Sequence, residues 1–111
     1  MFQQESVLER LMAVIEDRQR TRPDKSYTVS LFDGGTSKIG AKIVEEAAEV
    51  VDAAREPGNA GRAHLVYESG DLLYHLLVML AHRNVTFTEV EAELGRRFGV
   101  SGIDEKAARG T

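Results

Sequence analysis

Apolar residues recur at helical spacing along nearly the whole chain, and no segment shows a sustained alternation of apolar and polar residues. This pattern predicts helices and leaves no candidate strand. Four helices are expected, over residues 6–20, 36–55, 60–83 and 86–98. The fold class predicted from the sequence is therefore all-α, as a small bundle of four to five helices.

Turn residues interrupt the helical pattern near the N-terminus. Pro23 ends the first helix, and a short stretch that begins at Ser26 closes on the turn residues Asp33-Gly34-Gly35. Thr36 or Ser37 is expected to cap the second helix. The sequence thus predicts a short stretch that ends in a turn before the second helix begins.

The later boundaries carry equally specific signals. Pro57-Gly58 ends the second helix, and Thr86 followed three residues later by Glu89 predicts a capping box at the start of the fourth. The last dozen residues are rich in glycine and charge. We therefore expect a single domain, with a helical bundle over residues 6–98 and a tail over residues 99–111.

The length of the chain sets a limit on its core. At 111 residues and 12.2 kDa, it has the size of one domain. A domain of this size buries about two-thirds of the surface that its unfolded chain exposes, so its core is thin. Self-association would thicken this core, and we expect a homodimer.

Composition excludes several classes of protein. The chain has no cysteine, which excludes disulfide scaffolds, thiol catalysis and thiolate metal sites. A formal net charge of −4 argues against nucleic acid as a partner. The N-terminus lacks the features of a secretory signal, and the longest apolar cluster, residues 72–81, is too short to span a membrane. We expect no nucleic-acid partner, no membrane partner and a location in the cytoplasm.

One face of the second predicted helix carries most of its charged residues. On a helical wheel, five of them fall within an arc of about 80° and a sixth flanks this arc. They are Lys38, Lys42, Glu45, Glu49 and Asp52, with Glu46 at the edge. The opposite side is apolar, so an ordinary solvated face of an amphipathic helix is one interpretation.

The third predicted helix is apolar around almost its whole circumference, which indicates a buried helix. The exception is one narrow polar stripe, made of His64, Glu68, Asp71, His75 and His82. Buried carboxylates are costly to keep ionised unless their charge is compensated. Three alternatives stay open: a raised pKa, Lys or Arg partners (in the first place an ion pair with Lys38 or Lys42), or a bound metal ion.

Together the two helices contain E-E-x-x-E, then eighteen residues, then E-x-x-D. Spacings of three and four residues place the carboxylates on one face of each helix, and the hairpin between the helices can set the two faces opposite each other. Several Asp and Glu oxygens suit Mg²⁺ or Mn²⁺ better than Zn²⁺ or copper. A ferritin-like di-iron site is disfavoured because neither helix has a Glu-x-x-His pair.

This carboxylate motif resembles the hallmark of the MazG-like nucleoside triphosphate pyrophosphohydrolases, an all-α superfamily. Within that superfamily, the surrounding sequence is similar to the phosphoribosyl-ATP pyrophosphatase family over about residues 26–109. The similar segments are Ser26-Tyr27-Thr28, Gly34-Gly35, residues 38–50, residues 68–78 and the ending that runs to Lys106. At Gly70 the family more often has alanine.

The resemblance implies hydrolysis of phosphoribosyl-ATP to phosphoribosyl-AMP and pyrophosphate, the second step of histidine biosynthesis. It implies a dimer or larger assembly and a Mg²⁺ cofactor, for which Mn²⁺ could substitute. The implied metal ligands are Glu46, Glu49, Glu68 and Asp71. Glu45 is the candidate for orienting or deprotonating the attacking water, with Glu46 and Glu49 as alternatives. Lys38 and Lys42 would bind phosphate oxygens of the substrate.

Two other functions stay open. One is a MazG-like house-cleaning enzyme that acts on ordinary or damaged nucleotides with the same metal site. The other is a non-catalytic helical module that offers its acidic face to a basic partner. The carboxylates predict the chemistry, whereas only the surrounding sequence predicts the substrate.

Three further residues attract weaker predictions. We expect His75 to be a structural hydrogen-bonding residue beside Asp71, and His64, near a helix end, to be exposed rather than functional. Tyr27 could stack on an adenine or pack against the third helix, and the sequence does not choose between these roles.

Overall fold

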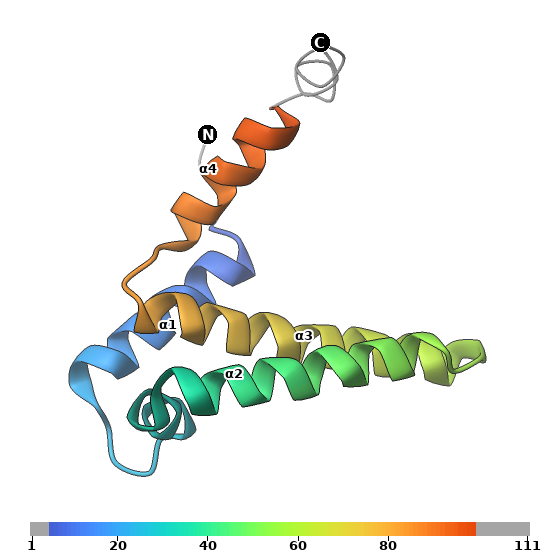
Figure 1. Ribbon diagram of the computed structural model, residues 1–111, viewed down its shortest axis with the longest axis horizontal. Coiled ribbons are helices and arrows are strands. Elements are labelled where there is room, and N and C mark those ends of the chain that lie inside the picture. Colours follow the sequence, from blue (N-terminus) through green and yellow to red (C-terminus); the bar gives the residue numbers. More distant parts are fainter. Residues whose placement is uncertain (1–4, 100–111) are drawn as a thin grey trace.

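The computed structural model describes residues 5–99, and every element in this part of the chain is a helix (Figure 1). The helices are α1 (Val7–Thr21), α2 (Tyr27–Ala54), α3 (Gly58–His82) and α4 (Phe87–Phe98). The predicted all-α fold is confirmed, and the predicted tail lies outside the described residues apart from Gly99. Within residues 5–99, no helix combines the length and the apolar character needed to cross a lipid bilayer.

The helices begin where side chains satisfy their first free N–H groups. Thr86 and Glu89 form the predicted capping box at the start of α4, and Ser6 and Glu9 form a second one at the start of α1. At the start of α2, the Ser26 side chain accepts a hydrogen bond from the backbone N–H three residues later. These local contacts explain why three of the four helices start where they do.

The stretch before the predicted second helix is itself helical, so the predicted start of that helix at a Thr36 or Ser37 cap is wrong. α2 already begins at Tyr27, and it is interrupted by non-helical backbone at Gly35 (φ 68°, ψ −163°). Glycine adopts such a positive φ readily because it has no Cβ. The Asp33-Gly34-Gly35 signal therefore marks a kink between two helical segments, and the helix ahead of it is started by the Ser26 cap.

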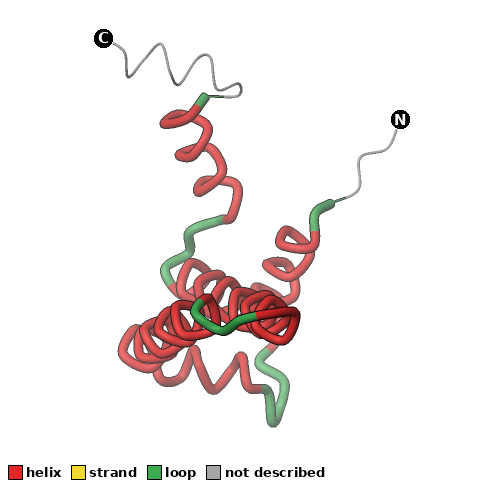
Figure 2. The backbone as a smooth tube through the Cα atoms, turned by 90° about the vertical axis from the view of Figure 1, so that its right-hand side faces the viewer, coloured by secondary structure: helices red, strands yellow, loops and turns green. Residues whose placement is uncertain are grey.

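The core lies where three helices meet. α2 and α3 run side by side as a helical hairpin, and α1 packs against them (Figure 1). The fully buried side chains of this core are Ile15, Leu31, Ile39, Leu77 and Val78. α4 extends away from the hairpin (Figure 2). Phe87, at the start of α4, packs against the core. The shared core fixes α2 against α3, and with them the polar side chains that the two helices present to each other.

The prediction that α3 is buried on all sides is wrong for the single chain. Val66 and Tyr67 are 74% and 67% exposed, and Leu73 and Leu76 are exposed as well. α1 and α2 cover one part of α3, and α2 exposes an apolar residue of its own, Val44. Apolar periodicity indicates that a surface needs a cover, but it does not say whether the same chain provides that cover.

Candidate active site

The α2–α3 hairpin brings the five predicted carboxylates together. Glu45, Glu46 and Glu49 lie on α2, and Glu68 and Asp71 lie on α3. Glu46, Glu68 and Asp71 each offer an oxygen within 4.8 Å of the others, and the three α2 carboxylates form a second group that meets the same limit. Glu46 belongs to both groups, so it joins the acidic face of α2 to that of α3.

Two oxygens of this carboxylate cluster are buried without a hydrogen-bond partner among the described residues. They are Oε2 of Glu46 and Oε1 of Glu68, which belong to residues that are 4% and 7% exposed. A buried carboxylate oxygen without a partner costs free energy, which a proton, a donor or a cation would recover. Ionised carboxylates are acceptors only, so they cannot satisfy one another. The donor set therefore fits a cation that prefers oxygen ligands.

The pKa values of the cluster are consistent with crowded negative charge. Burial, together with the neighbouring carboxyls of Glu49 and Asp71, raises the pKa of Glu46 to about 7, and the Lys42 ammonium opposes this rise. The pKa of Glu49 is raised first by the adjacent carboxyl of Glu68 and then by burial. Protons and a divalent cation would therefore compete for these oxygens near neutral pH.

The two predicted phosphate-binding lysines lie in different surroundings. Lys42 Nζ is 3.1 Å from Oε2 of Glu45 and 3.9 Å from Oε1 of Glu46. The hydrogen bond to Glu45 is the main reason that the pKa of Lys42 is raised. Lys38 Nζ instead donates to the backbone oxygen of Ser30 at 3.3 Å. Lys42 thus touches the carboxylate cluster, whereas Lys38 is held at the N-terminal segment of α2.

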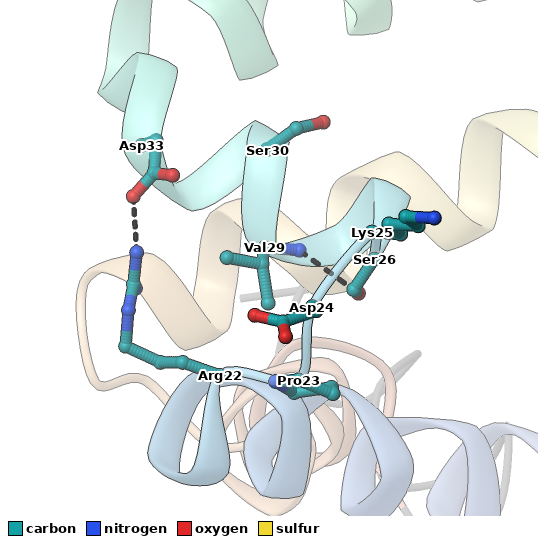
Figure 3. Close-up of a pocket in the computed structure, with 8 residues that line it drawn as sticks. All are labelled: Arg22, Pro23, Asp24, Lys25, Ser26, Val29, Ser30 and Asp33. Atoms are coloured by element: carbon teal, nitrogen blue, oxygen red, sulfur yellow. Dashed lines mark hydrogen bonds and ion pairs between the residues drawn. The ribbon is translucent and has the colours of Figure 1, made fainter.

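A pocket of about 440 Å³ lies beside the connection between α1 and α2 (Figure 3). Ser26 and Ser30 contribute to its lining, and an ion pair between Arg22 and Asp33 spans one side of it. None of the predicted site residues lines this pocket. It is therefore separate from the carboxylate cluster, although Lys38 reaches the backbone of a lining residue.

Glu68 pairs with a histidine rather than with a lysine. Nε2 of His64 is 2.9 Å from Oε2 of Glu68, and Nδ1 of His64 is 2.8 Å from Oε2 of Glu56. Both carboxylates raise the pKa of His64, with Glu56 as the larger cause. Among the described residues, neither of the two predicted lysines forms an ion pair with a carboxylate of α3. The ion-pair alternative predicted for α3 is therefore not observed.

His64 and Glu56 lie near the cluster, and the sequence predicted no role in the site for either residue. The four-residue spacing from His64 to Glu68 is a readable signal, because such residues are neighbours on a helix surface. Glu56 carries no comparable signal, since it reaches His64 only through the packing of the hairpin turn. His64 was expected to be exposed, and its side chain is indeed 40% exposed, but both of its ring nitrogens are engaged.

His75 is a buried hydrogen-bonding residue, as predicted. Its Nδ1 lies 2.8 Å from the backbone oxygen of Asp71, which can only accept, so Nδ1 is the protonated nitrogen. The Tyr27 hydroxyl then donates to Nε2 at 2.9 Å. The rings of Tyr27 and Tyr74 also stack, with centroids 6.3 Å apart. Tyr27 therefore packs against α3, and its stacking on an adenine stays a prediction.

Comparisons with known proteins agree with this architecture. A family model described as phosphoribosyl-ATP pyrophosphohydrolase matches residues 8–98. A phosphoribosyl-ATP pyrophosphatase of Rhodopirellula baltica is 52% identical, over 92% of this chain and 85% of the relative. Proteins of the same name from Cereibacter sphaeroides and Paramagnetospirillum magneticum are 53% and 51% identical, over 95% and 98% of this chain and 99% and 97% of the relatives. The chain therefore belongs to the phosphoribosyl-ATP pyrophosphohydrolase family.

Proposed function

We propose that this chain hydrolyses phosphoribosyl-ATP to phosphoribosyl-AMP and pyrophosphate, as the second step of histidine biosynthesis. Relatives that share about half of its residues over nearly its whole length carry the name of this activity. The observation that carries the proposal is the meeting of carboxylates from two helices in two groups that share Glu46, with two buried oxygens that lack a partner among the described residues. Its location in the cytoplasm stays a prediction.

We propose Mg²⁺ as the cofactor, held by Glu46, Glu49, Glu68 and Asp71, with Mn²⁺ able to replace it. Carboxylate oxygens are the ligands that these two cations prefer. When bound, the cation supplies positive charge that offsets the charge developing on the pyrophosphate leaving group. The two buried oxygens without a partner in residues 5–99 support this assignment, because a cation would satisfy them.

The proposed reaction places Glu45 and Lys42 next to the substrate. A water oxygen forms a bond to the α-phosphorus of the substrate. The bond from that phosphorus to the oxygen that bridges the α- and β-phosphates breaks, and pyrophosphate leaves. Glu45, which is more exposed than Glu46, accepts a proton of this water. Lys42 binds phosphate oxygens as a point charge. Lys38 can join it by exchanging the Ser30 backbone oxygen for a phosphate oxygen.

Release of pyrophosphate is the direct test of this function. We expect the purified protein with Mg²⁺ to release pyrophosphate from phosphoribosyl-ATP in strong preference to ATP and a panel of deoxynucleoside triphosphates. Removal of the divalent cation by chelation is expected to abolish the reaction. Activity confined to the other nucleotides would replace the proposal with a house-cleaning function. A lack of activity on every substrate would favour the non-catalytic module.

We further propose that two copies of the chain form the functional assembly. The exposed apolar residues of α3 support this, since Val66 and Tyr67 would gain a cover at the interface of a dimer. Light scattering is expected to give twice the 12.2 kDa mass of the chain. Val66→Glu would place a charge in that interface and shift the assembly toward monomer. A parent protein that is monomeric at the concentrations used for assay would refute the proposal.

A further inference from the structure

We propose that His64 is a positioning residue for the metal ligand Glu68, and that Glu56 holds His64 in place for this role. The inference rests on the proposed metal site and adds a supporting contact to it. In outline, the hairpin turn fixes Glu56, Glu56 fixes one side of the His64 ring, and the other side of the ring fixes one oxygen of Glu68.

The two ring nitrogens of His64 each contact a carboxylate oxygen. Nδ1 lies 2.8 Å from Oε2 of Glu56, and Nε2 lies 2.9 Å from Oε2 of Glu68. An ionised carboxylate only accepts hydrogen bonds, so a ring held between two of them donates from both nitrogens. The ring is therefore fixed at both ends rather than free to rotate.

The two carboxylate oxygens of Glu68 differ in their contacts. Oε2 is hydrogen-bonded to His64, whereas Oε1 is buried and has no partner among the described residues. The carboxylates of Glu68, Glu46 and Asp71 lie close enough to share a cation. The contact with His64 thus orients the Glu68 carboxylate and leaves an oxygen of it for the cluster. Contacts that orient ligands in this way support metal binding in other proteins.

The position of Glu56 is set by contacts of the turn between α2 and α3. Glu56 lies in the turn between α2 and α3, where its backbone N–H donates to the Ala53 oxygen at 3.1 Å. Gly61, on the first turns of α3, packs so closely that a Cβ there would overlap the backbone carbonyl of Glu56. The hairpin therefore sets the place of Glu56, and the acceptor for His64 is built into the fold.

An ordinary surface ion pair is the competing interpretation. The side chains of Glu56 and His64 are 45% and 40% exposed, and exposed pairs contribute little. The side chain of Glu68, however, is only 10% exposed, so the ring acts on a buried group. The two interpretations also differ in sign. Loss of a nearby positive charge alone would tighten the binding of a divalent cation, whereas loss of the positioning contact would weaken it.

Binding of Mn²⁺ alone to the full chain tests the inference without any substrate. Titration followed by electron paramagnetic resonance measures free Mn²⁺ directly. We expect His64→Ala to raise the Kd for Mn²⁺ by roughly 10-fold or more, as for other contacts that orient ligands. Glu56→Ala is expected to raise it less. In the double variant, the Kd should match that of His64→Ala, because Glu56 acts through His64.

Two further variants separate positioning from charge and from folding. Arg55→Ala removes a positive charge from the same turn, where Arg55 contacts Asp52 rather than the carboxylate cluster, and it should leave the Kd unchanged. His64→Arg keeps donors for both carboxylates and should recover most of the lost affinity. Melting of the metal-free variants checks that each is folded. With substrate, His64→Ala should need more Mg²⁺ for half-maximal activity and regain most of kcat at saturating Mg²⁺.

Each outcome bears on one proposal or on both. If the parent binds Mn²⁺ and His64→Ala binds it equally well or more tightly, the inference is wrong while the metal site stands. If the effects of Glu56→Ala and His64→Ala simply add, Glu56 does not act through His64. A parent protein that binds no Mn²⁺ would overturn the proposed metal site and this inference with it.

Discussion

Glu49→Gln and Asp71→Asn are expected to lower kcat/KM for pyrophosphate release by about 100-fold or more while the protein stays folded. Each substitution keeps the size of the side chain and removes one negative charge from the carboxylate cluster. An amide is a poorer ligand than a carboxylate for a hard divalent cation, so charge compensation at the leaving group is lost. Initial rates at saturating Mg²⁺ measure the effect.

Asp52→Asn is the matched control for these substitutions. Asp52 lies on the same charged face of α2, but its partner is Arg55, at 3.8 Å, and it belongs to neither carboxylate group. Its replacement makes the same change of charge and should leave the rate near that of the parent. Near-normal turnover in Glu49→Gln or Asp71→Asn would remove that residue from the set of metal ligands.

The stability of the metal-free protein provides an independent check on the same variants. The pKa of Glu46 rises from its usual 4.5 to about 7 on folding. Between these values the folded chain binds more protons than the unfolded chain, so the free energy of unfolding falls as the pH rises. Glu49→Gln and Asp71→Asn remove neighbours that cause this shift. We therefore expect melting in chelator to depend less on pH for both variants than for the parent.

The carboxylate cluster was predictable because its signal is local and regular. Spacings of three and four residues define a face of a helix whatever the helix packs against. A single hairpin is then enough to bring Glu46 of α2 to Glu68 and Asp71 of α3, and Glu49 to Glu68. The sequence could not assign a role to each carboxylate. The side chain of Glu46 is buried and that of Glu45 is exposed, and this difference depends on the tertiary fold.

The missed features depend on contacts that cross the fold. The glycine pair Gly34-Gly35 predicts a turn at the end of residues 27–34. The Ser26 cap, at which this stretch begins as a helix, is a weaker signal in the sequence. Glu56 meets His64 across the hairpin turn, where the backbone of Glu56 packs closely against Gly61. The apolar circumference of α3 predicted burial on all sides, which the single chain does not have, because periodicity does not distinguish a cover within the chain from one outside it.

Gly61→Ala is expected to destabilise the protein by about 2 kcal/mol, because the new Cβ would overlap the backbone carbonyl of Glu56. A backbone group cannot move aside by changing rotamer, so the α2–α3 hairpin would have to open. The value of about 2 kcal/mol is the net loss, because it already includes the higher helix propensity of alanine, which offsets about 1 kcal/mol of the strain. For a chain of this size, the net loss should lower the Tm by roughly 10 °C. Opening of the turn would also move Glu56 away from His64 and weaken the binding of Mn²⁺.

Gly70→Ala gives the matched comparison, because it makes the same chemical change on the same helix. Among the described residues, no atom beyond the neighbouring residues and nearby backbone of α3 itself lies within 4 Å of the position that a Cβ would take at Gly70. The gain in helix propensity is then unopposed, so this variant should be more stable than the parent by about 0.5–1 kcal/mol. Thermal melting of both variants in the metal-free state measures the contrast. If Gly61→Ala melted as high as Gly70→Ala, the close approach at the turn would not constrain the hairpin, and the position of Glu56 would need another cause.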